Sequence, residues 1–441
     1  MLKYTATFLS LLLYATPGSC KESTPTHFFT LSNGIKVLVQ EDHRAPVVLT
    51  QLWYSVGSRC ELRPNTGLSH VLEHMLFHGT KTHPKGVYES LILDQGGTYN
   101  AFTSQDVTSY YSFVPKESFD TILDVEVDRM QHIDFQPEAF QKEMKVVKEE
   151  RRMRTDDHPL GKLKEQLNAL AFMQGPYGNP VIGWMEDLDQ MTMQDAKAWY
   201  QQWYAPQNMV ITVGGDVEPK TVVAKLEKKF GSLPVTKVET PKVVSDQLVG
   251  LARQDLQMSL PVKAPKLVYA FRVPSLGVHQ DTAYALGLVS AWLEGKNYPL
   301  YTQLVREQKV ATNVSVEYNF YQKGYSLFVV DVSPAPGVSL AQLATVFEKT
   351  WNTLAQTTPT DTALANLKMG WVSGKVYDSD SLSAQLQTIG YLETIGLGWQ
   401  TYQKGFEKVE AMRLDDLQAA FQKHLSLKQV ICINVTPQEA S

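Results

Sequence analysis

The sequence predicts an α+β fold made of two homologous halves, each an α/β-sandwich-like layer of helices on a sheet. The first observation is an internal repeat, described below. The second is that strand-like and helical runs are interspersed without the regular alternation that marks a parallel α/β sheet. The third is size, because 441 residues with 43% hydrophobic content exceed one ordinary domain and suffice for two cores.

The repeat pairs residues 186–216 with residues 407–437, which align without gaps. Met191 falls on Met412, for example, and the register holds along the whole stretch. In each copy a helical pattern with an acidic start leads into a short strand rich in β-branched residues. A register kept for this long favours a duplication over a chance similarity between two helix–strand units.

The boundary between the halves is expected in the polar, proline-bearing stretch from Pro234 to Val249. We therefore predict an N-terminal half over residues 26–235, a linker over 236–250 and a C-terminal half over 251–441.

The N-terminal half begins with two strand-like runs around Asn33-Gly34, a pair typical of a tight turn. A second hairpin is predicted between Gly96 and Pro115, where β-branched and aromatic residues are frequent. Helical periodicity dominates the segments between and after these hairpins. The predicted helices cover residues 67–79, 85–95, 117–132, 137–154 and 194–203.

Residues 1–20 are predicted to be a cleaved signal peptide. Lys3 gives a positive start, and the apolar run from Phe8 to Ala15 is far shorter than a membrane span. We therefore expect an exported or periplasmic protein. Lipid attachment at Cys20 and a frayed N-terminal helix are the less favoured alternatives, and no later stretch is long and apolar enough for a membrane helix.

The composition excludes some function classes. The formal net charge is −5, from 41 basic and 46 acidic residues, and no basic tract stands out, so nucleic acid is not an expected partner. Three cysteines are too few for a disulfide scaffold. Cys60 and Cys432 are expected to be buried free thiols.

The segment GLSHVLEHMLFH, residues 67–78, contains the candidate metal-binding and catalytic residues. On a helix His70 and His74 share one face, so both imidazoles can bind one metal ion. Glu73 precedes the second histidine and can contact a water molecule on that metal rather than the metal itself. A zinc ion lowers the pKa of such a water, and a neighbouring carboxylate can take its proton as a carbonyl is attacked.

This His-x-x-Glu-His order is a recognised signature of zinc peptidases. The alternative is a pair of surface histidines with a solvated glutamate on an amphipathic helix. The neighbouring side chains argue against that alternative, because they are apolar and predict a largely buried helix. These neighbours are Leu68, Val71, Leu72, Met75 and Leu76.

A catalytic zinc usually has three protein ligands and one open position, so a third ligand is needed. The predicted helix that runs to residue 154 offers Glu143 and Glu150, two turns apart on one face, with Glu149 on another face. Spacing alone does not choose among them. His78 is a further candidate, but its position drifts around the helix, so we rank it as a supporting or surface residue.

With these motifs the sequence resembles the M16, or pitrilysin-type, zinc peptidases, which include mitochondrial processing peptidase and insulin-degrading enzyme. The likeness covers nearly the whole chain after the signal peptide and is closest to bacterial members of similar length. It includes LSNGIKVLVQEDHRAP, GLSHVLEHMLFHGT, GGTYNAFTSQDVTSYY, VVKEERRMRTDDHP and PYGNPVIG. The resemblance implies that Glu150 is the third ligand and that Glu143 is a supporting acidic residue that handles protons or positions a ligand.

The resemblance also implies an architecture and a mechanism. Two halves, or four in a dimer, enclose a chamber for short or unfolded peptides, which add a strand to a sheet edge. Asn100 and Ala101 are then the expected backbone contacts of the substrate. One zinc ion per chain is expected, with Glu73 as the catalytic base, although manganese or cobalt would suit the same ligands.

One departure from the family pattern concerns the C-terminal half. Active members carry an arginine there, followed seven positions later by a tyrosine that holds the substrate. Arg306 is present, but Thr312 or Asn313 stands where the tyrosine is expected. We therefore expect a homodimer, or a heterodimer with a homologous subunit that supplies the missing residue. The alternative function is a non-catalytic peptide-binding or scaffold protein of the same fold.

Overall fold

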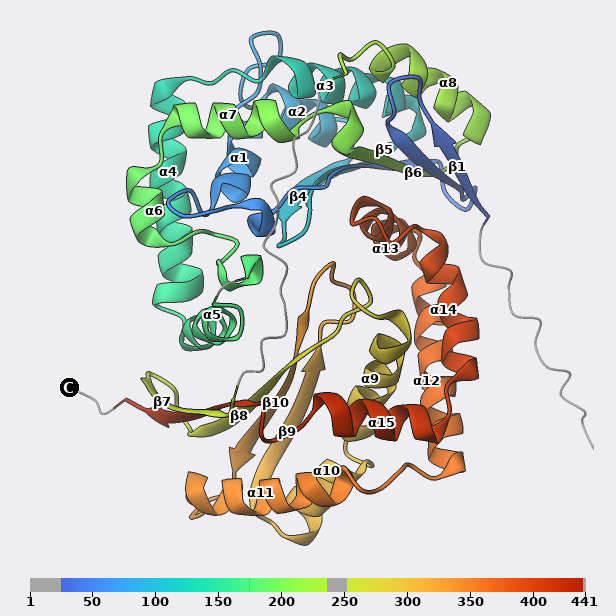
Figure 1. Ribbon diagram of the computed structural model, residues 1–441. Coiled ribbons are helices and arrows are strands. Elements are labelled where there is room, and N and C mark those ends of the chain that lie inside the picture. Colours follow the sequence, from blue (N-terminus) through green and yellow to red (C-terminus); the bar gives the residue numbers. More distant parts are fainter. Residues whose placement is uncertain (1–24, 174, 236–251, 439–441) are drawn as a thin grey trace, which may run out of the picture.

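The computed structural model describes residues 25–173, 175–235 and 252–438. It contains two halves, each with a sheet and its own helices, so the predicted α+β architecture is confirmed (Figure 1). The predicted signal peptide (residues 1–20) and the predicted linker (residues 236–250) lie outside the described residues.

The N-terminal half contains a six-stranded sheet in the order β1-β2-β6-β3-β5-β4. β2 and β6 are parallel, and the other neighbours are antiparallel. Both predicted hairpins are present as β1–β2 and β4–β5, and Gly34 in the first turn has a φ of 93°, which favours glycine. The strands are β1 (Thr26–Thr30), β2 (Lys36–Glu41), β3 (Val47–Tyr54), β4 (Thr98–Thr103), β5 (Thr108–Pro115) and β6 (Met209–Gly215).

Helices cover the outer face of this sheet. All five predicted helices are found; four are shorter than predicted, and the one predicted over 194–203 begins one residue earlier, at Met193. Two helices begin one residue after a glycine in the left-handed conformation, Gly67 and Gly86. These glycines make both helices begin later than the periodicity predicts. α4 ends at Arg151, and the chain continues as a π-helical turn, Arg152–Asp156. The helices are α1 (Leu68–Leu76), α2 (Val87–Leu93), α3 (Phe119–His132), α4 (Pro137–Arg151), α5 (Pro159–Ala171), α6 (Met185–Gln190), α7 (Met193–Trp203) and α8 (Pro219–Phe230).

The C-terminal half contains a five-stranded sheet in the order β7-β11-β8-β10-β9. Its strands are β7 (Gln254–Leu260), β8 (Lys266–Val273), β9 (Ala311–Tyr318), β10 (Ser326–Pro334) and β11 (Ile431–Pro437). Its helices are α9 (Gln280–Leu293), α10 (Pro299–Tyr301), α11 (Leu340–Leu354), α12 (Asp361–Asp380), α13 (Leu382–Thr394), α14 (Gln400–Ala411) and α15 (Leu414–His424).

The two copies of the sequence repeat fold in the same way. In each copy a helix, α7 or α15, leads into a strand, β6 or β11, that lies inside its sheet. β6 is parallel to β2, and β11 is parallel to β7, so the central strand also has equivalent neighbours. This agreement supports the inferred duplication.

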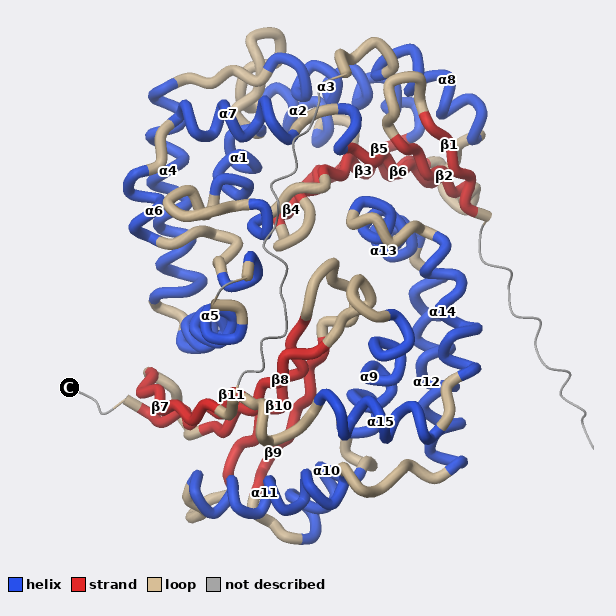
Figure 2. The backbone as a smooth tube through the Cα atoms, in the orientation of Figure 1, coloured by secondary structure: helices blue, strands red, loops and turns tan. Residues whose placement is uncertain are grey.

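Each half contributes one helix that packs on the sheet of the other half. α13 of the C-terminal half packs on β6 and β3 of the N-terminal sheet, where Gly390 lies against Trp53. In the other direction, α5 of the N-terminal half packs with Leu163 and Leu167 against the C-terminal sheet. Figure 2 shows α13 directly below the N-terminal sheet and α5 above β7 of the C-terminal sheet. The inner face of each sheet is therefore covered in part by the opposite half.

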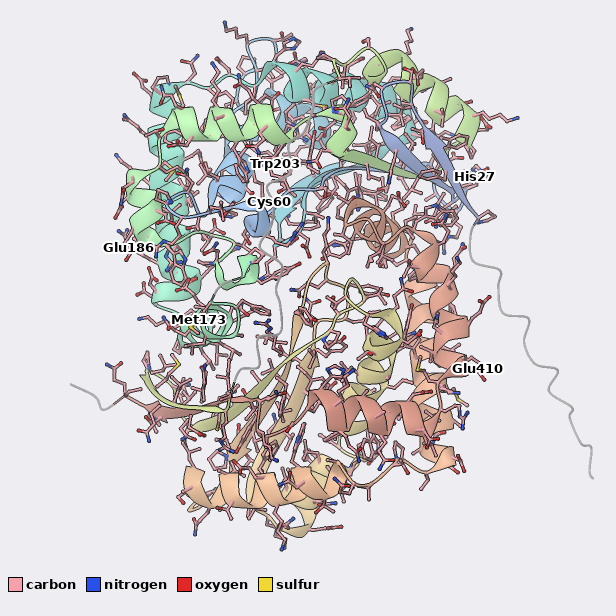
Figure 3. The ribbon with its side chains drawn as sticks, in the orientation of Figure 1. His27, Cys60, Met173, Glu186, Trp203 and Glu410 are labelled. Carbon is pink, nitrogen blue, oxygen red and sulfur yellow. The ribbon has the colours of Figure 1, made fainter. Side chains whose placement is uncertain are left out.

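Each half has an apolar interior of its own. Trp203 and Cys60 are buried in the N-terminal half (Figure 3). Cys60 and Cys432 are both buried free thiols, as predicted. None of the helices in the described part of the chain has the length and apolar character needed to span a membrane.

Candidate metal centre

The centre is built on α1, which begins at Leu68 after the left-handed Gly67. Its apolar residues face the core, so the helix is buried as predicted. Because no side chain of its own N-cap residue caps the helix, a carboxylate from outside does so. The oxygens of the buried Glu61 accept the N–H groups of Gly67 at 2.6 Å and Ser69 at 2.7 Å.

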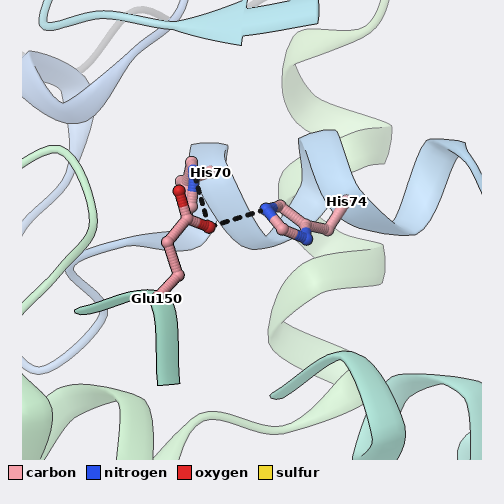
Figure 4. Close-up of side chains that lie close together, drawn as sticks. All are labelled: His70, His74 and Glu150. Atoms are coloured by element: carbon pink, nitrogen blue, oxygen red, sulfur yellow. Dashed lines mark ion pairs between the residues drawn. The ribbon is translucent and has the colours of Figure 1, made fainter. Parts of the chain in front are cut away.

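Three side chains from α1 and α4 meet at one point. The Nε2 atoms of His70 and His74 lie 3.7 and 3.3 Å from the same oxygen, Oε2, of Glu150 (Figure 4). The three candidate ligand atoms all lie within 4.8 Å of one another. The other carboxylate oxygen of Glu150 forms a 2.8 Å ion pair with Arg154, which leaves Oε2 directed at the histidines.

This donor set fits a zinc ion. Tetrahedral zinc with nitrogen and oxygen ligands at about 2.0–2.1 Å places those ligand atoms about 3.3 Å apart. The distances from Glu150 to the two imidazoles are of this size. In the described residues, this is the group of three His, Cys, Asp or Glu side chains close enough to hold a metal.

Glu143 contacts His74 and His78, and not the point where His70, His74 and Glu150 meet. Its Oε2 is 3.2 Å from Nδ1 of His74, and its Oε1 is 2.6 Å from Nε2 of His78 and 3.3 Å from Nζ of Lys85. The hydrogen bonds from His74 and His78 hold the pKa of Glu143 well below its usual range. An ionised Glu143 therefore keeps the Nδ1 proton on His74 and leaves Nε2 free for a metal. The Nδ1 atom of His70 has no such partner among the described residues.

The surroundings of the two histidines shift their pKa values in opposite directions. Burial, together with the neighbouring His74, lowers the pKa of His70 to about 4. Burial also acts to lower the pKa of His74, but hydrogen bonds to Glu143 and Glu150 outweigh it and raise that pKa to about 9. A metal must therefore displace a proton from His74 when it binds.

Glu73 lies on α1 between His70 and His74 and is not one of the three candidate ligands. Its carboxylate accepts a hydrogen bond from the hydroxyl of Thr103, at the end of β4. Burial raises the pKa of Glu73, and the Thr103 hydrogen bond opposes that rise only in part. A carboxylate with a raised pKa in this position is suited to take up a proton near neutral pH.

These residues open onto a cavity of about 1670 Å³ between the two halves. Its wall includes the candidate metal ligands His70, His74 and Glu150 and the free edge of β4, with Asn100 and Ala101. The N–H of Ala101 contacts the Asn100 side chain at 2.8 Å rather than a neighbouring strand. The C-terminal half closes the opposite side with residues of its sheet, among them Lys266, Val268, Ser315, Glu317, Leu327, Val329 and Asp331.

Two residues considered from sequence lie away from the centre. Glu149 is exposed and pairs with Arg152. Arg306 is also exposed, with its guanidinium 5.8 Å from the ring centre of Tyr301, and it does not line the cavity. The structure of one chain therefore does not bring Arg306 to the metal centre, and its role in substrate binding stays a prediction.

Sequence reasoning missed two residues that contact the centre's helix. Thr103 holds the carboxylate of Glu73, and Glu61 caps α1. An acidic residue shortly before a helix whose first residue is preceded by glycine was a usable sequence signal for Glu61. No comparable signal existed for Thr103, because its contact depends on how β4 lies against α1.

Comparisons with known proteins agree with this geometry. A family model described as insulinase (peptidase family M16) matches residues 36–184, and one described as peptidase M16 inactive domain matches residues 190–370. The chain is 30% identical over 344 residues to the zinc protease PqqE of Helicobacter pylori, covering 76% of this chain and 77% of that protein. It is 26% identical over 392 residues to the uncharacterized zinc protease YmxG of Bacillus subtilis, covering 88% and 92%.

Solved structures show the same fold. The crystal structure of a protease from Helicobacter pylori superimposes with a TM-score of 0.83 at 24% identity, covering 94% of this chain and 100% of that chain. A structure described as the peptidase M16 inactive domain from Pseudomonas fluorescens superimposes with a TM-score of 0.81 at 16% identity, covering 95% and 99%.

Proposed function

The chain belongs to the M16 family of peptidases, and we propose that it is a zinc-dependent endopeptidase that hydrolyses short or unfolded polypeptides. The observation that carries the proposal is the convergence of His70, His74 and Glu150, with Glu73 beside them, on the wall of a large cavity. The relatives named as zinc proteases support the same reading.

Each residue of the centre has a role in this proposal. His70, His74 and Glu150 would hold zinc, which supplies Lewis acidity for the scissile carbonyl and the attacking water. Glu73 takes the proton of that water and passes it to the nitrogen of the leaving amine. Thr103 holds the Glu73 carboxylate in place for both transfers.

The substrate would bind along the free edge of β4. This strand pairs with β5 on one side only, so its other side can accept an added strand. Asn100 and Ala101 lie on this edge, within the cavity wall, and would make backbone contacts to the peptide. Such contacts bind any extended chain, which fits unfolded substrates of varied sequence.

An apolar strip beside Glu150 adds a preference for side chains. Val146, Met153 and Leu160 line the cavity although they are 47%, 67% and 47% exposed. Exposed apolar side chains in a concave wall suit bulky apolar groups of a ligand. We expect cleavage next to large apolar residues, to be checked by mass spectrometry of the fragments from a mixed peptide pool.

We further propose that a second M16 subunit completes the substrate site, either as a homodimer or as a heterodimer. The argument is that Arg306 lies outside the cavity of its own chain, so an arginine beside the substrate would have to come from a partner. Mixing Glu73→Gln protein with Arg306→Ala protein tests this idea. A homodimer with shared sites regains part of its activity on mixing, whereas independent sites give none.

Export to the periplasm is proposed from the signal-like residues 1–20, with lipid attachment at Cys20 as the alternative. Mass spectrometry of the mature N-terminus in fractionated cells distinguishes cleavage, lipidation and retention.

The test of the proposed base is Glu73→Gln, which keeps the shape but cannot take a proton. The variant is expected to bind zinc as the wild type does and to lose most turnover of an unstructured peptide. Near-normal turnover would show that Glu73 is not the base. If wild-type protein binds zinc and peptide without cleavage, alone and with a homologous subunit, the non-catalytic binding role is the correct one.

A further inference from the structure

The carboxylate of Asp106 contacts both halves of the chain. Asp106 lies in the turn between β4 and β5, and it is 2% exposed. From the N-terminal half, Nε of Arg59 and the hydroxyl of Tyr177 both donate to its Oδ1 at 2.8 Å. From the C-terminal half, the N–H of Lys323 donates to Oδ2 at 3.1 Å. The hydroxyl of Tyr391 lies 3.4 Å from Oδ2 and 3.3 Å from the carbonyl oxygen of Tyr321, so it shares its hydrogen between the two.

The C-terminal partners come from two separate elements. Lys323 lies in the loop between β9 and β10, and Tyr391 lies on α13, the helix that covers the N-terminal sheet. The same loop approaches Tyr177, whose hydroxyl accepts the N–H of Gly324 at 2.8 Å. A Cβ at Gly324 would meet the Tyr177 ring at 2.4 Å, so the loop fits closely against the N-terminal half.

The turn that carries Asp106 also carries the contact to the catalytic base. Thr103, which donates to Glu73, lies only a few residues before Asp106. The turn is further tied to the segment before α1, because the N–H of Arg59 donates to the carbonyl of Gln105 at 2.9 Å. A shift of the Asp106 side chain would therefore move both the free edge of β4 and the partner of Glu73.

Burial makes this arrangement sensitive to the contact between the halves. A carboxylate that is almost fully buried needs all of its hydrogen-bond donors, because an unpaired buried charge is strongly unfavourable. Separation of the halves would remove the donors from Lys323 and Tyr391, and the Asp106 side chain and its turn would have to rearrange. The carboxylate thus has its full set of partners only while the halves are docked.

We propose that Asp106 is a positioning residue that couples docking of the C-terminal half to the position of the substrate edge and of Glu73. The inference rests on the proposed function, and it assigns to that function a dependence on contact between the halves. It concerns side chains that contact neither zinc nor the substrate.

The test compares two variants with one matched control. Asp106→Asn keeps the shape of the side chain but turns an amide NH₂ toward one of the donors. Tyr177→Phe keeps the ring and removes one donor, so it decides the question if Asp106→Asn does not fold. The control is Lys36→Met, which breaks a different contact between the halves, the 2.6 Å ion pair between β2 and Glu393 on α13, and leaves the partners of Asp106 in place.

Three quantities are measured on the full chain: zinc content, kcat and KM for an unstructured peptide, and amide exchange of residues 103–107 and 323–324. Both variants are expected to keep zinc and to exchange faster in these segments. Their kcat per bound zinc should fall about tenfold or more and KM should rise, since a displacement of about 1 Å can cost roughly 100-fold. For Lys36→Met, kcat per bound zinc should stay within about twofold of the wild-type value.

The inference is overturned if both variants keep kcat per bound zinc within about twofold of wild type. It is also overturned if Lys36→Met loses as much as they do, because the loss would then follow from looser halves in general. A purely structural role for Asp106 would lower the amount of folded, zinc-bound protein and leave kcat per bound zinc and KM unchanged. Wild-type protein without zinc or cleavage would instead contradict the proposed function, which these assays report separately.

Discussion

Replacement of Glu61 by glutamine is expected to change how the stability of the N-terminal half depends on pH. Glu61 is wholly buried and accepts the first N–H groups of α1 from Gly67 and Ser69. Burial raises the pKa of its carboxyl from 4.5 to about 7, although these two hydrogen bonds act to lower it. The site helix is therefore capped by a group that titrates near neutral pH.

The sign of the effect follows from the raised pKa. Between about pH 4.5 and 7 the folded protein keeps a proton on Glu61 that the unfolded chain has lost, so the free energy of unfolding falls as the pH rises. One pKa unit corresponds to about 1.4 kcal/mol, so the fall amounts to about 3 kcal/mol across this window. Between pH 5 and pH 8 the free energy of unfolding falls by about 2.5 kcal/mol through this group. Glutamine does not titrate, so Glu61→Gln lacks this part of the pH dependence.

The assay is urea unfolding of wild type and variant at pH 5 and pH 8, with chelator present so that metal binding does not contribute. Asp187→Asn is the control, because Asp187 is a buried carboxylate that holds the same loop through Thr66. Burial acts to raise the pKa of Asp187, but hydrogen bonds from Thr66 and Arg63 outweigh it and lower that pKa. Its stabilisation is therefore already complete at pH 5, and Asp187→Asn should destabilise equally at both pH values. If Glu61→Gln also changes stability equally at both, the reasoning about Glu61 is wrong.

Three further variants probe the centre and the contact between the halves. Glu143→Gln should weaken zinc binding about 10- to 100-fold, measured by competition with a coloured chelator, because His74 loses the partner that orients it. Thr103→Val removes a hydrogen bond that lowers the pKa of Glu73, so the acid limb of kcat/KM should move to higher pH. Gly390→Ala should destabilise the protein by about 1–3 kcal/mol in thermal unfolding, because the new Cβ would meet Nε1 of Trp53 at 2.5 Å.

Each of these variants has a matched control. Glu149→Gln changes an exposed glutamate of the same helix and should leave zinc affinity unchanged. Thr103→Ser keeps the hydroxyl and should keep the wild-type pH profile. Gly370→Ala places a Cβ in open space on a helix and should be neutral or stabilise by up to about 1 kcal/mol. A control that behaves like its partner contradicts the corresponding prediction.

Helical spacing predicted the two histidines and the buried character of α1, because both follow from local periodicity. It left Glu143, Glu149 and Glu150 open as the third ligand, since any of them could belong to a solvated helix. In the structure, Glu150 reaches both imidazoles and Glu143 reaches the far side of one, so the two glutamates on one face both serve the centre. Which of the two glutamates reaches both imidazoles depends on how α4 crosses α1. The spacing of residues along the sequence carries no information about that crossing.

Other features depend on tertiary packing and could not be predicted. Periodicity shows which face of α5 or α13 is apolar, but not that each helix covers the sheet of the opposite half. The contact of Thr103 with Glu73 and the four donors around Asp106 depend likewise on how distant segments meet. The internal repeat, by contrast, is visible in sequence because both copies use the same helix and strand.

The most direct test of the central claim measures metal content and cleavage together. Purified mature protein is analysed for bound metal, and its cleavage of a quenched unstructured peptide is followed with and without chelator, alongside Glu73→Gln. We expect one zinc ion per chain in both proteins and chelator-sensitive cleavage in the wild type, with a homologous subunit added if the chain alone is inactive. Protein that binds no zinc at His70, His74 and Glu150, or cleavage that chelator does not affect, would contradict the account.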